Sequence, residues 1–185
     1  KGTKVVLSVR SFRPLYNIAT IVRSIPLVAQ KINKVKYLLV VGHGADDGYV
    51  SRIRELIAEL GIEKCVVVVD FLPKEEVPRI HNIADIVISV PSSDAFPCSL
   101  HEAMACKVAP IVSDLPAIKD LLKHDFNAMV VPVKDHQRLA AVTIDLLENE
   151  AKCRRFMEYN YNLVREKADA RKNVQEIEGL FDRLI

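Results

Sequence analysis

The sequence predicts an α/β fold, a Rossmann-like three-layer sandwich with about six parallel strands and helices on both faces of the sheet. Short β-branched runs alternate along the chain with longer segments of helical period, which is typical of βαβ units. Most of the short runs are apolar throughout, as expected for strands that helices cover on both sides. The predicted strands are residues 4–9, 36–41, 65–70, 84–90, 108–113 and 128–131.

Chain length and composition predict one globular domain, residues 1–185. Hydrophobic residues make up 50% and charged residues 27% of the chain, a balance that argues against disorder and against a coiled coil. The formal net charge of +2 arises from interspersed acidic and basic residues, so nucleic-acid binding is not indicated. Since the sequence opens at Lys1, close to a strand, we expect it to be a piece of a longer protein.

Apolar residues repeat at the spacing of one helix face in four segments. These stripes are Ile18, Ile21, Val22 and Ile25; Val50, Ile53, Leu56, Ile57 and Leu60; Leu139, Val142 and Leu146; and Val174, Ile177, Phe181 and Leu184. Pro26 should kink or shorten the first helix, because proline lacks a donor and clashes with the preceding turn. A break is predicted near residues 166–173. The last stripe predicts a helix packed on the core, with contact to a partner as the alternative.

The four cysteines show no CxxC pairing, and most lie within or beside apolar runs. They are Cys65, Cys98, Cys106 and Cys153. We therefore expect buried free thiols rather than disulfides or a metal site, which fits a cytoplasmic location. No apolar stretch approaches the roughly 18 to 20 residues of a membrane span, and the N-terminus lacks a signal-peptide layout.

Ligands of open parallel sheets bind at the carboxyl ends of the strands, so the loops there are candidate sites. Arg10 and Arg13 follow the first predicted strand, where guanidinium groups can pair with phosphate oxygens. Exposed loop arginines are an equally good interpretation. Gly42 and Gly44 follow the second strand and permit a tight turn or a close approach to a ligand. That loop lacks the third glycine of a dinucleotide fingerprint and the lysine of a P-loop, which disfavours NAD and Walker-type ATP binding. The histidines do not cluster at ligand spacing, so no metal site is predicted.

The segment after the fourth predicted strand is the most informative. Pro97 suits the first position of a helix that begins near Cys98. The free amides of Cys98, Ser99 and Leu100 would then face the ligand crevice, an arrangement that suits an anion such as diphosphate.

Two carboxylates lie on either side of this predicted helix start. Asp94 is in the loop ahead of it, and Glu102 follows about one turn inside. Carboxylates accept hydrogen bonds from hydroxyls, so the pair suits a polyol such as a ribose or a hexose. Such spacing alone is common by chance.

In context, these residues resemble the nucleotide-sugar-binding domain of the group-1, glycogen-synthase-like glycosyltransferases. The family signature is an acidic residue, seven others, Glu-Ala-Met-Ala, and a strand carrying Pro-Val-Ile or similar. Here it reads Asp94, then Glu102-Ala103-Met104-Ala105, then Pro110-Ile111-Val112. Further matches are Val40-Val41-Gly42-His43-Gly44, Asp70-Phe71-Leu72-Pro73, Ala84-Asp85, and Asn127 ahead of Val130-Val131-Pro132.

The resemblance implies a GT-B enzyme, in which two Rossmann-like domains face a cleft and this chain is the C-terminal one. It implies retaining transfer of a hexose from a nucleotide-diphosphate sugar, which is a co-substrate, with no metal and no cofactor. The acceptor would bind the N-terminal domain of the same protein. Contact with a membrane surface would come only through that missing half, and this domain alone should not transfer sugar efficiently.

The resemblance also implies a role for each candidate residue. Asp94, which contacts hydroxyls of the transferred sugar, and Arg10, which stabilises the diphosphate, are the implied catalytic residues. Glu102 would hold the ribose hydroxyls. The remaining implied donor-binding residues are Arg13, Gly42, Gly44, Phe71 and Leu72 beside the base, and Phe96, Pro97, Cys98 and Ser99 beside the sugar and phosphates.

The chain departs from the family pattern in the first loop and at several glycines. The family's first-loop lysine falls near Tyr16 and Asn17, and Asp94 stands where glutamate is usual. The replaced glycines are at Ala95, Lys107, Ala117 and Ala128. A catalytically degenerate module with a binding or structural role is therefore the alternative, and a sugar-nucleotide epimerase of the same architecture is a third hypothesis.

Overall fold

Six parallel strands form one sheet in the order β3-β2-β1-β4-β5-β6. The structure, a computed structural model, describes residues 2–183. The strands are β1 (Lys4–Ser8), β2 (Val35–Val40), β3 (Val66–Val69), β4 (Ile86–Ser89), β5 (Ala109–Ser113) and β6 (Met129–Val131). Every neighbouring pair is parallel, and every strand coincides with a predicted run. The predicted α/β class is confirmed.

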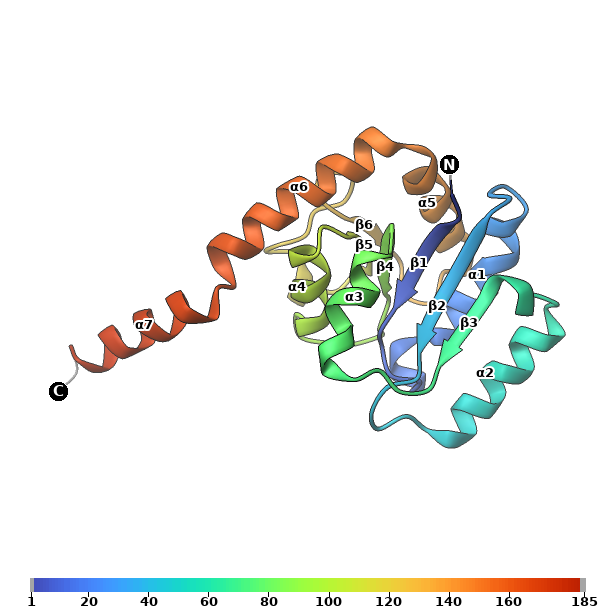
Figure 1. Cartoon of the computed structure of the whole chain (residues 1–185), viewed down its shortest axis with the longest axis horizontal. Coiled ribbons are helices and arrows are strands. Elements are labelled where there is room, and N and C mark those ends of the chain that lie inside the picture. The colour runs from blue at the N-terminus through green and yellow to red at the C-terminus, as the bar shows by residue number, and fades with distance from the viewer. Residues whose placement is uncertain (1, 184–185) are drawn as a thin grey trace.

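Helices cover both faces of this sheet (Figure 1). They are α1 (Ile18–Ala29), α2 (Asp47–Glu59), α3 (Val77–Asn82), α4 (Cys98–Ala105), α5 (His136–Glu148), α6 (Glu150–Lys167) and α7 (Ala170–Phe181). Because side chains alternate along a strand, Val6 packs with α1, α2 and α5 while Leu7 faces the side of α3. Val87 likewise faces α4, whereas Ile86 and Ile88 pack with Val6 on the side of α1, α2 and α5.

Helix α1 continues through Pro26 to Ala29, so the prediction that Pro26 would shorten the helix is wrong. Its apolar face is fully buried: Ile18, Ile21, Val22, Ile25 and Val28 are each 0% exposed. Burial of a complete helix face outweighs the local cost of about 3 kcal/mol that an interior proline carries. The core therefore decides where this helix ends.

The predicted break near residues 166–173 is confirmed, because α6 ends at Lys167 and α7 begins at Ala170. The predicted core packing of the last helix is wrong. No residue of α7 is buried, and Val174, Ile177 and Phe181 are 52%, 52% and 62% exposed. Figure 1 shows α7 extending away from the sheet, whose faces the earlier helices already cover. Leu184, the last member of the predicted stripe, lies outside the described residues.

All four cysteines are free thiols. Cys65, Cys106 and Cys153 are half-buried, but Cys98 is exposed, so the prediction of burial is wrong for it. Cys98 begins α4 at the carboxyl edge of the sheet, where no helix layer covers it. Between residues 2 and 183, no helix combines the length and apolar character needed to cross a membrane.

A pair of buried amides fastens the segment before β6 to α6. The Asn160 side chain donates to the Asn127 carbonyl at 2.7 Å and accepts from Asn127 Nδ2 at 2.9 Å. Asn127 also accepts from the Lys123 amide at 2.8 Å and donates to the Leu121 carbonyl at 2.9 Å. With 1% and 0% exposure, Asn127 and Asn160 satisfy each other away from water.

Lys107, one of the positions where the family glycine is replaced, has a left-handed backbone with φ 55° two residues after the end of α4. Its ammonium pairs with Glu158 of α6 at 2.9 Å and lies 4.7 Å from the Tyr161 ring. The turn thus keeps a glycine-like conformation with a lysine in it.

Candidate functional site

Strands β1 and β4 are neighbours at the centre of the sheet, where the strand order changes direction. The connections from β1 and from β4 therefore leave the same carboxyl edge and lie side by side. Such a switch point is where open α/β sheets bind ligands. The Arg10 loop and the Asp94 loop meet there.

Arg10 and Asp94 form an ion pair, with 2.5 Å between Nη2 and Oδ2. Arg10 Nη1 also donates to Ser99 Oγ at 3.4 Å, across 89 positions of sequence. The Arg10 and Asp94 side chains are only 11% and 21% exposed. The structure thus brings three predicted site residues together in a partly desolvated cluster at the start of α4.

Helix α4 begins at Cys98, as predicted, but Pro97 is its N-cap rather than its first residue. Pro97 has an extended backbone, with ψ 139°, and its carbonyl accepts from the Leu100 amide at 3.0 Å. The prediction of a free Leu100 amide is therefore wrong, since the first turn closes on Pro97. Within residues 2–183, the Cys98 and Ser99 amides have no acceptor outside the helix and are available to an anion.

Glu102 is exposed on α4. It lies three residues after Ser99, so the two side chains share a helix face. Since Ser99 contacts Arg10, this places Glu102 on the same side of α4 as the ion pair. In the described part of the chain, no hydrogen bond or ion pair occupies its carboxylate.

Arg13 does not join this cluster. It is exposed and precedes a 3-10 turn, Pro14–Tyr16, as that turn's N-cap. Across residues 2–183 it forms no ion pair with Asp94 or Glu102. The predicted second cation of the first loop thus lies outside the Arg10–Asp94–Ser99 cluster.

The loop after β2 packs directly against the Arg10 loop. Gly42 and Gly44 have left-handed backbones, with φ 74° and 66°. A Cβ at Gly42 would lie 3.4 Å from the Ser11 Cα, which is an ordinary contact distance, so it is the left-handed backbone that favours glycine here. Ser11 Oγ donates to the His43 carbonyl at 2.9 Å, and the Phe12 amide donates to the Val41 carbonyl at 2.8 Å.

Two predicted aromatic residues differ in exposure. Phe71 is 56% exposed and meets the His43 ring edge-on, with 5.3 Å between ring centroids. Leu72, by contrast, is half-buried and packs against the core cluster of Leu7, Val40 and Ile80. Phe96 packs partly into the core under α4, and its ring lies 4.6 Å from that of His101. Burial lowers the pKa of His101, which favours the neutral ring.

Two residues of this edge were not predicted as functional. Arg10 lies over the ring of Tyr16, with 4.1 Å from Cζ to the ring centroid. Asn17 has a left-handed backbone, φ 53°, and its side-chain amide donates to the Val90 carbonyl and to Ser92 Oγ, both at 2.9 Å. An aromatic residue and an asparagine directly ahead of a helical stripe were the available sequence signal.

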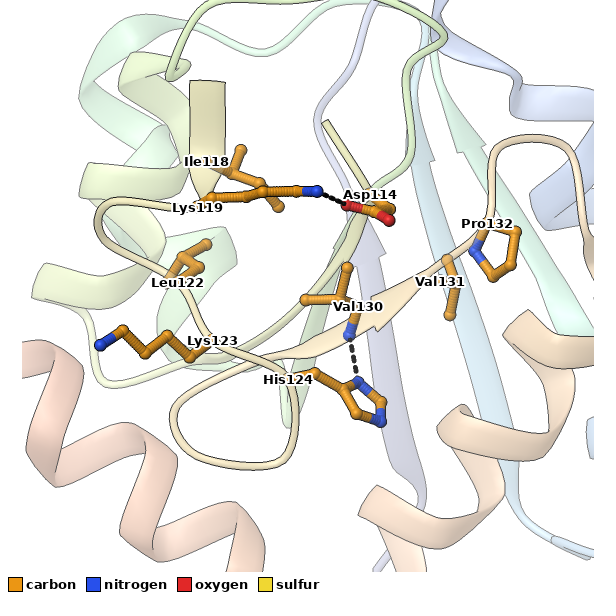
Figure 2. Close-up of a pocket in the computed structure, with 9 residues that line it drawn as sticks. All are labelled: Asp114, Ile118, Lys119, Leu122, Lys123, His124, Val130, Val131 and Pro132. Atoms are coloured by element: carbon orange, nitrogen blue, oxygen red, sulfur yellow. Dashed lines mark hydrogen bonds and ion pairs between the residues drawn. The ribbon is translucent and has the colours of Figure 1, made fainter. Parts of the chain in front are cut away.

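A separate cavity of about 480 Å³ lies beside β6 (Figure 2). It is lined by Asp114, Ile118, Lys119, Leu122, Lys123, His124, Val130, Val131 and Pro132, and it contains none of the predicted site residues. Lys119 pairs with Asp114 at 3.0 Å, and His124 Nδ1 accepts from the Val130 amide at 3.0 Å. Within the described chain, no group of three or more His, Cys, Asp or Glu side chains is arranged to hold a metal ion.

Comparison with solved structures gives the same architecture. Anabaena HepE, crystallised in complex with UDP and glucose, matches with a TM-score of 0.88 at 20% identity, over 98% of this chain and 49% of that one. The C-terminal domain of LpcC, a group 1 glycosyl transferase family protein of Francisella tularensis, matches with a TM-score of 0.82 at 19% identity, over 91% of this chain and 88% of that one. At these identities the likeness concerns the fold.

Among curated proteins, the N-acetyl-alpha-D-glucosaminyl L-malate synthase of Bacillus anthracis is 25% identical over 182 residues. The match covers 98% of this chain and 46% of that protein, so this chain spans about half of that relative's length.

The chain thus folds as a Rossmann-like α/β domain with the Arg10–Asp94–Ser99 cluster at the carboxyl edge of its sheet. The chain belongs to the glycosyl transferases group 1 family, whose model matches residues 1–163. The resemblance drawn from the sequence is confirmed.

Proposed function

We propose that this chain is the donor-binding domain of a retaining hexosyltransferase and that it binds a nucleotide-diphosphate sugar at the edge where the β1 and β4 connections meet. The observation that carries the proposal is the cluster of Arg10, Asp94 and Ser99 at the start of α4, with 2.5 Å between Arg10 and Asp94. The membership of the glycosyl transferases group 1 family supports it.

The diphosphate would lie between Arg10 and the first turn of α4. The Arg10 guanidinium supplies fixed positive charge, and the Cys98 and Ser99 amides add donors at the positive end of the helix dipole. When the sugar leaves, negative charge develops on the departing diphosphate, and these groups stabilise it there. This arrangement supports transfer in which protein groups, without a metal ion or cofactor, neutralise the leaving group.

The hydroxyl groups of the donor would be held by the two carboxylates. Asp94 lies beside Arg10 and would accept from hydroxyls of the hexose, while Glu102, farther along α4, would accept from the ribose. The exposed Phe71 ring, braced by His43, offers an apolar surface to the base. The UDP in the HepE structure makes a uridine nucleotide the first to test.

The rest of the enzyme would be an N-terminal domain that binds the acceptor, because this chain spans about half of its relatives' length. We therefore expect no efficient transfer by this chain alone. Retention follows from the family resemblance. Four free thiols suit a reducing compartment, and the cytoplasm is the proposed location.

Calorimetric titration of the folded chain with UDP, GDP and ADP tests the donor site. Binding of at least one of them is expected. Absence of binding by all three at millimolar concentration, in protein whose circular dichroism shows the α/β fold, would rule the donor site out.

A catalytically degenerate module is the second candidate. The exposed Arg13 favours it, because of the two arginines of the first loop only Arg10 joins the cluster and could neutralise a diphosphate. Sugar transfer by the full-length protein separates the two. A large loss of transfer in Asp94→Ala is expected for an enzyme, whereas unchanged transfer supports the degenerate module.

A further inference from the structure

We infer that Tyr16 is a positioning residue of the proposed donor site and that its ring holds the Arg10 guanidinium in the orientation that meets the diphosphate. The inference rests on the proposed function and assigns a role to a residue that the family signature does not include.

The Arg10 guanidinium lies over the Tyr16 ring. Arg10 Cζ is 4.1 Å from the ring centroid, well inside the range of about 6 Å at which an aromatic face attracts a cation. The Arg10 side chain is 11% exposed, so water competes little for this contact. Arg10 Nε is buried and has no acceptor among residues 2–183. The ring face and the two terminal nitrogens therefore define the guanidinium plane.

The backbone around Tyr16 is fixed to the same loop that carries Asp94. The Leu15 carbonyl accepts from the Ser92 amide at 2.8 Å. On the other side of Tyr16, the Asn17 side chain donates to the Val90 carbonyl and to Ser92 Oγ. The ring is half-buried and packs against the core cluster of α1. Tyr16 and Asp94, which both contact Arg10, therefore lie on two segments that hydrogen bonds join to each other.

An aromatic face suits this task because it attracts the cation without using an N–H donor. Asp94 accepts from Nη2 and Ser99 accepts from Nη1, so a diphosphate would share these two nitrogens with the present partners or take the place of those partners. The Tyr16 ring remains in place during that exchange. The guanidinium then keeps its plane and its edge toward α4 while its anionic partner changes.

Comparison of Tyr16→Phe with Tyr16→Leu tests the role of the ring, because only the first variant keeps it. The Tyr16 hydroxyl makes no hydrogen bond within the described residues, so phenylalanine preserves the contact, whereas leucine keeps an apolar side chain but removes the aromatic face. The matched control is Tyr161→Leu, because Tyr161 is also half-buried and also lies beside cations, Lys107 and Arg165, but belongs to α6.

Each variant is titrated with UDP, GDP and ADP and with the corresponding nucleosides, and its melting temperature is recorded. We expect Tyr16→Leu to weaken binding of the preferred nucleotide about threefold to thirtyfold. Tyr16→Phe and Tyr161→Leu should remain within about twofold of the wild type. Nucleoside affinity should be the same in all four proteins, because Arg10 acts on the phosphates.

The Nε–H resonance of Arg10 gives a readout that needs no nucleotide. The ring current of an aromatic face shifts that resonance, so it should move in Tyr16→Leu and stay in place in Tyr16→Phe. An unmoved resonance in Tyr16→Leu, or equal nucleotide binding by folded Tyr16→Leu and wild type, overturns the positioning role alone. Wild-type protein that binds none of the three nucleotides overturns the donor site, and the positioning role with it.

Discussion

Arg10 and Asp94 are 84 residues apart in sequence, yet their side chains form an ion pair with 2.5 Å between Nη2 and Oδ2. In this state, the cation that would meet the diphosphate and the carboxylate that would meet the sugar neutralise each other. A bound donor would therefore compete with this pair, with the diphosphate binding Arg10 and a sugar hydroxyl binding Asp94.

Replacing Asp94 by asparagine should tighten the binding of a nucleotide that carries no sugar. The carboxylate competes with the diphosphate for Arg10 and repels it, so Asp94→Asn is expected to bind UDP about threefold to tenfold more tightly. Calorimetry measures the change. Asp114→Asn, which removes the carboxylate of the exposed Lys119 pair, is the control and should bind like the wild type. Weaker binding by Asp94→Asn would contradict the competition.

Replacing Glu102 by glutamine should weaken UDP binding about tenfold, because charged acceptors make the stronger hydrogen bonds to ribose hydroxyls. The melting temperature should not change, since Glu102 is exposed and has no partner in the described residues. Glu55→Gln on α2 is the matched control, being another exposed helical glutamate. Equal affinities of Glu102→Gln and Glu55→Gln would remove Glu102 from the site.

Replacing Asn160 by alanine should cost about 2 to 3 kcal/mol of unfolding free energy, because it leaves the buried Asn127 amide without its partner. Urea denaturation followed by circular dichroism gives the value. Asn162→Ala, two residues along the same helix and exposed, should cost much less. Similar losses of unfolding free energy in both variants would show that the amide pair does not stabilise the fold.

The stability of the fold should fall between pH 7 and pH 4 because of His81. This ring is 0% exposed, and burial lowers its pKa from 6.5 to about 4. The unfolded chain therefore takes up the proton first as the pH drops, which favours unfolding, and the effect is complete once the pH passes the folded value. The difference of the two pKa values corresponds to about 3 kcal/mol.

Denaturation of the wild type and of His81→Leu across this pH range measures the contribution. Both ring nitrogens of His81 are buried without a hydrogen-bond partner among residues 2–183, so leucine removes a titrating group at little cost in hydrogen bonds. The pH dependence should be shallower in His81→Leu. Parallel profiles for the two proteins would assign the acid sensitivity to other groups.

Deleting residues 168–185 should leave the melting temperature almost unchanged, because α7 buries no residue. Deleting residues 150–185 is the contrasting truncation, since it also removes Phe156 and Asn160, which are both 0% exposed. That second truncation should unfold the domain or lower its melting temperature steeply. A steep loss from the shorter deletion would mean that α7 contributes to the fold after all.

The sheet could be predicted from the sequence because most of its strands are short, largely apolar runs. β4 and β5 are buried at every position, which is the pattern that such runs indicate. The exposure of α7 could not be predicted in this way. Its stripe has the period of a packed helix, but burial depends on whether a face of the sheet is still uncovered. Pro26 shows the reverse case, in which burial overrides a local helix-breaking signal.

The site divides similarly. Arg10, Asp94 and Ser99 could be predicted because strand ends, a helix start and a family signature all mark them, and the structure brings these three together. The remaining assignments to the donor stay predictions. Tyr16 was missed because its contact with Arg10 depends on the path of the intervening loop. Residue type and position after the first strand also mark Arg13, but its exposed side chain does not join the cluster.

The adjacency of β1 and β4 has a consequence for how the domain folds. β1, β2 and β3 with their helices can associate locally, but Arg10 meets Asp94 only after β4 has inserted beside β1. Contacts across such long stretches of chain form late, because closing the intervening loop costs entropy first. Nucleotide affinity during refolding should therefore appear only when both halves of the sheet have joined, so ligand binding reports completion of the native topology.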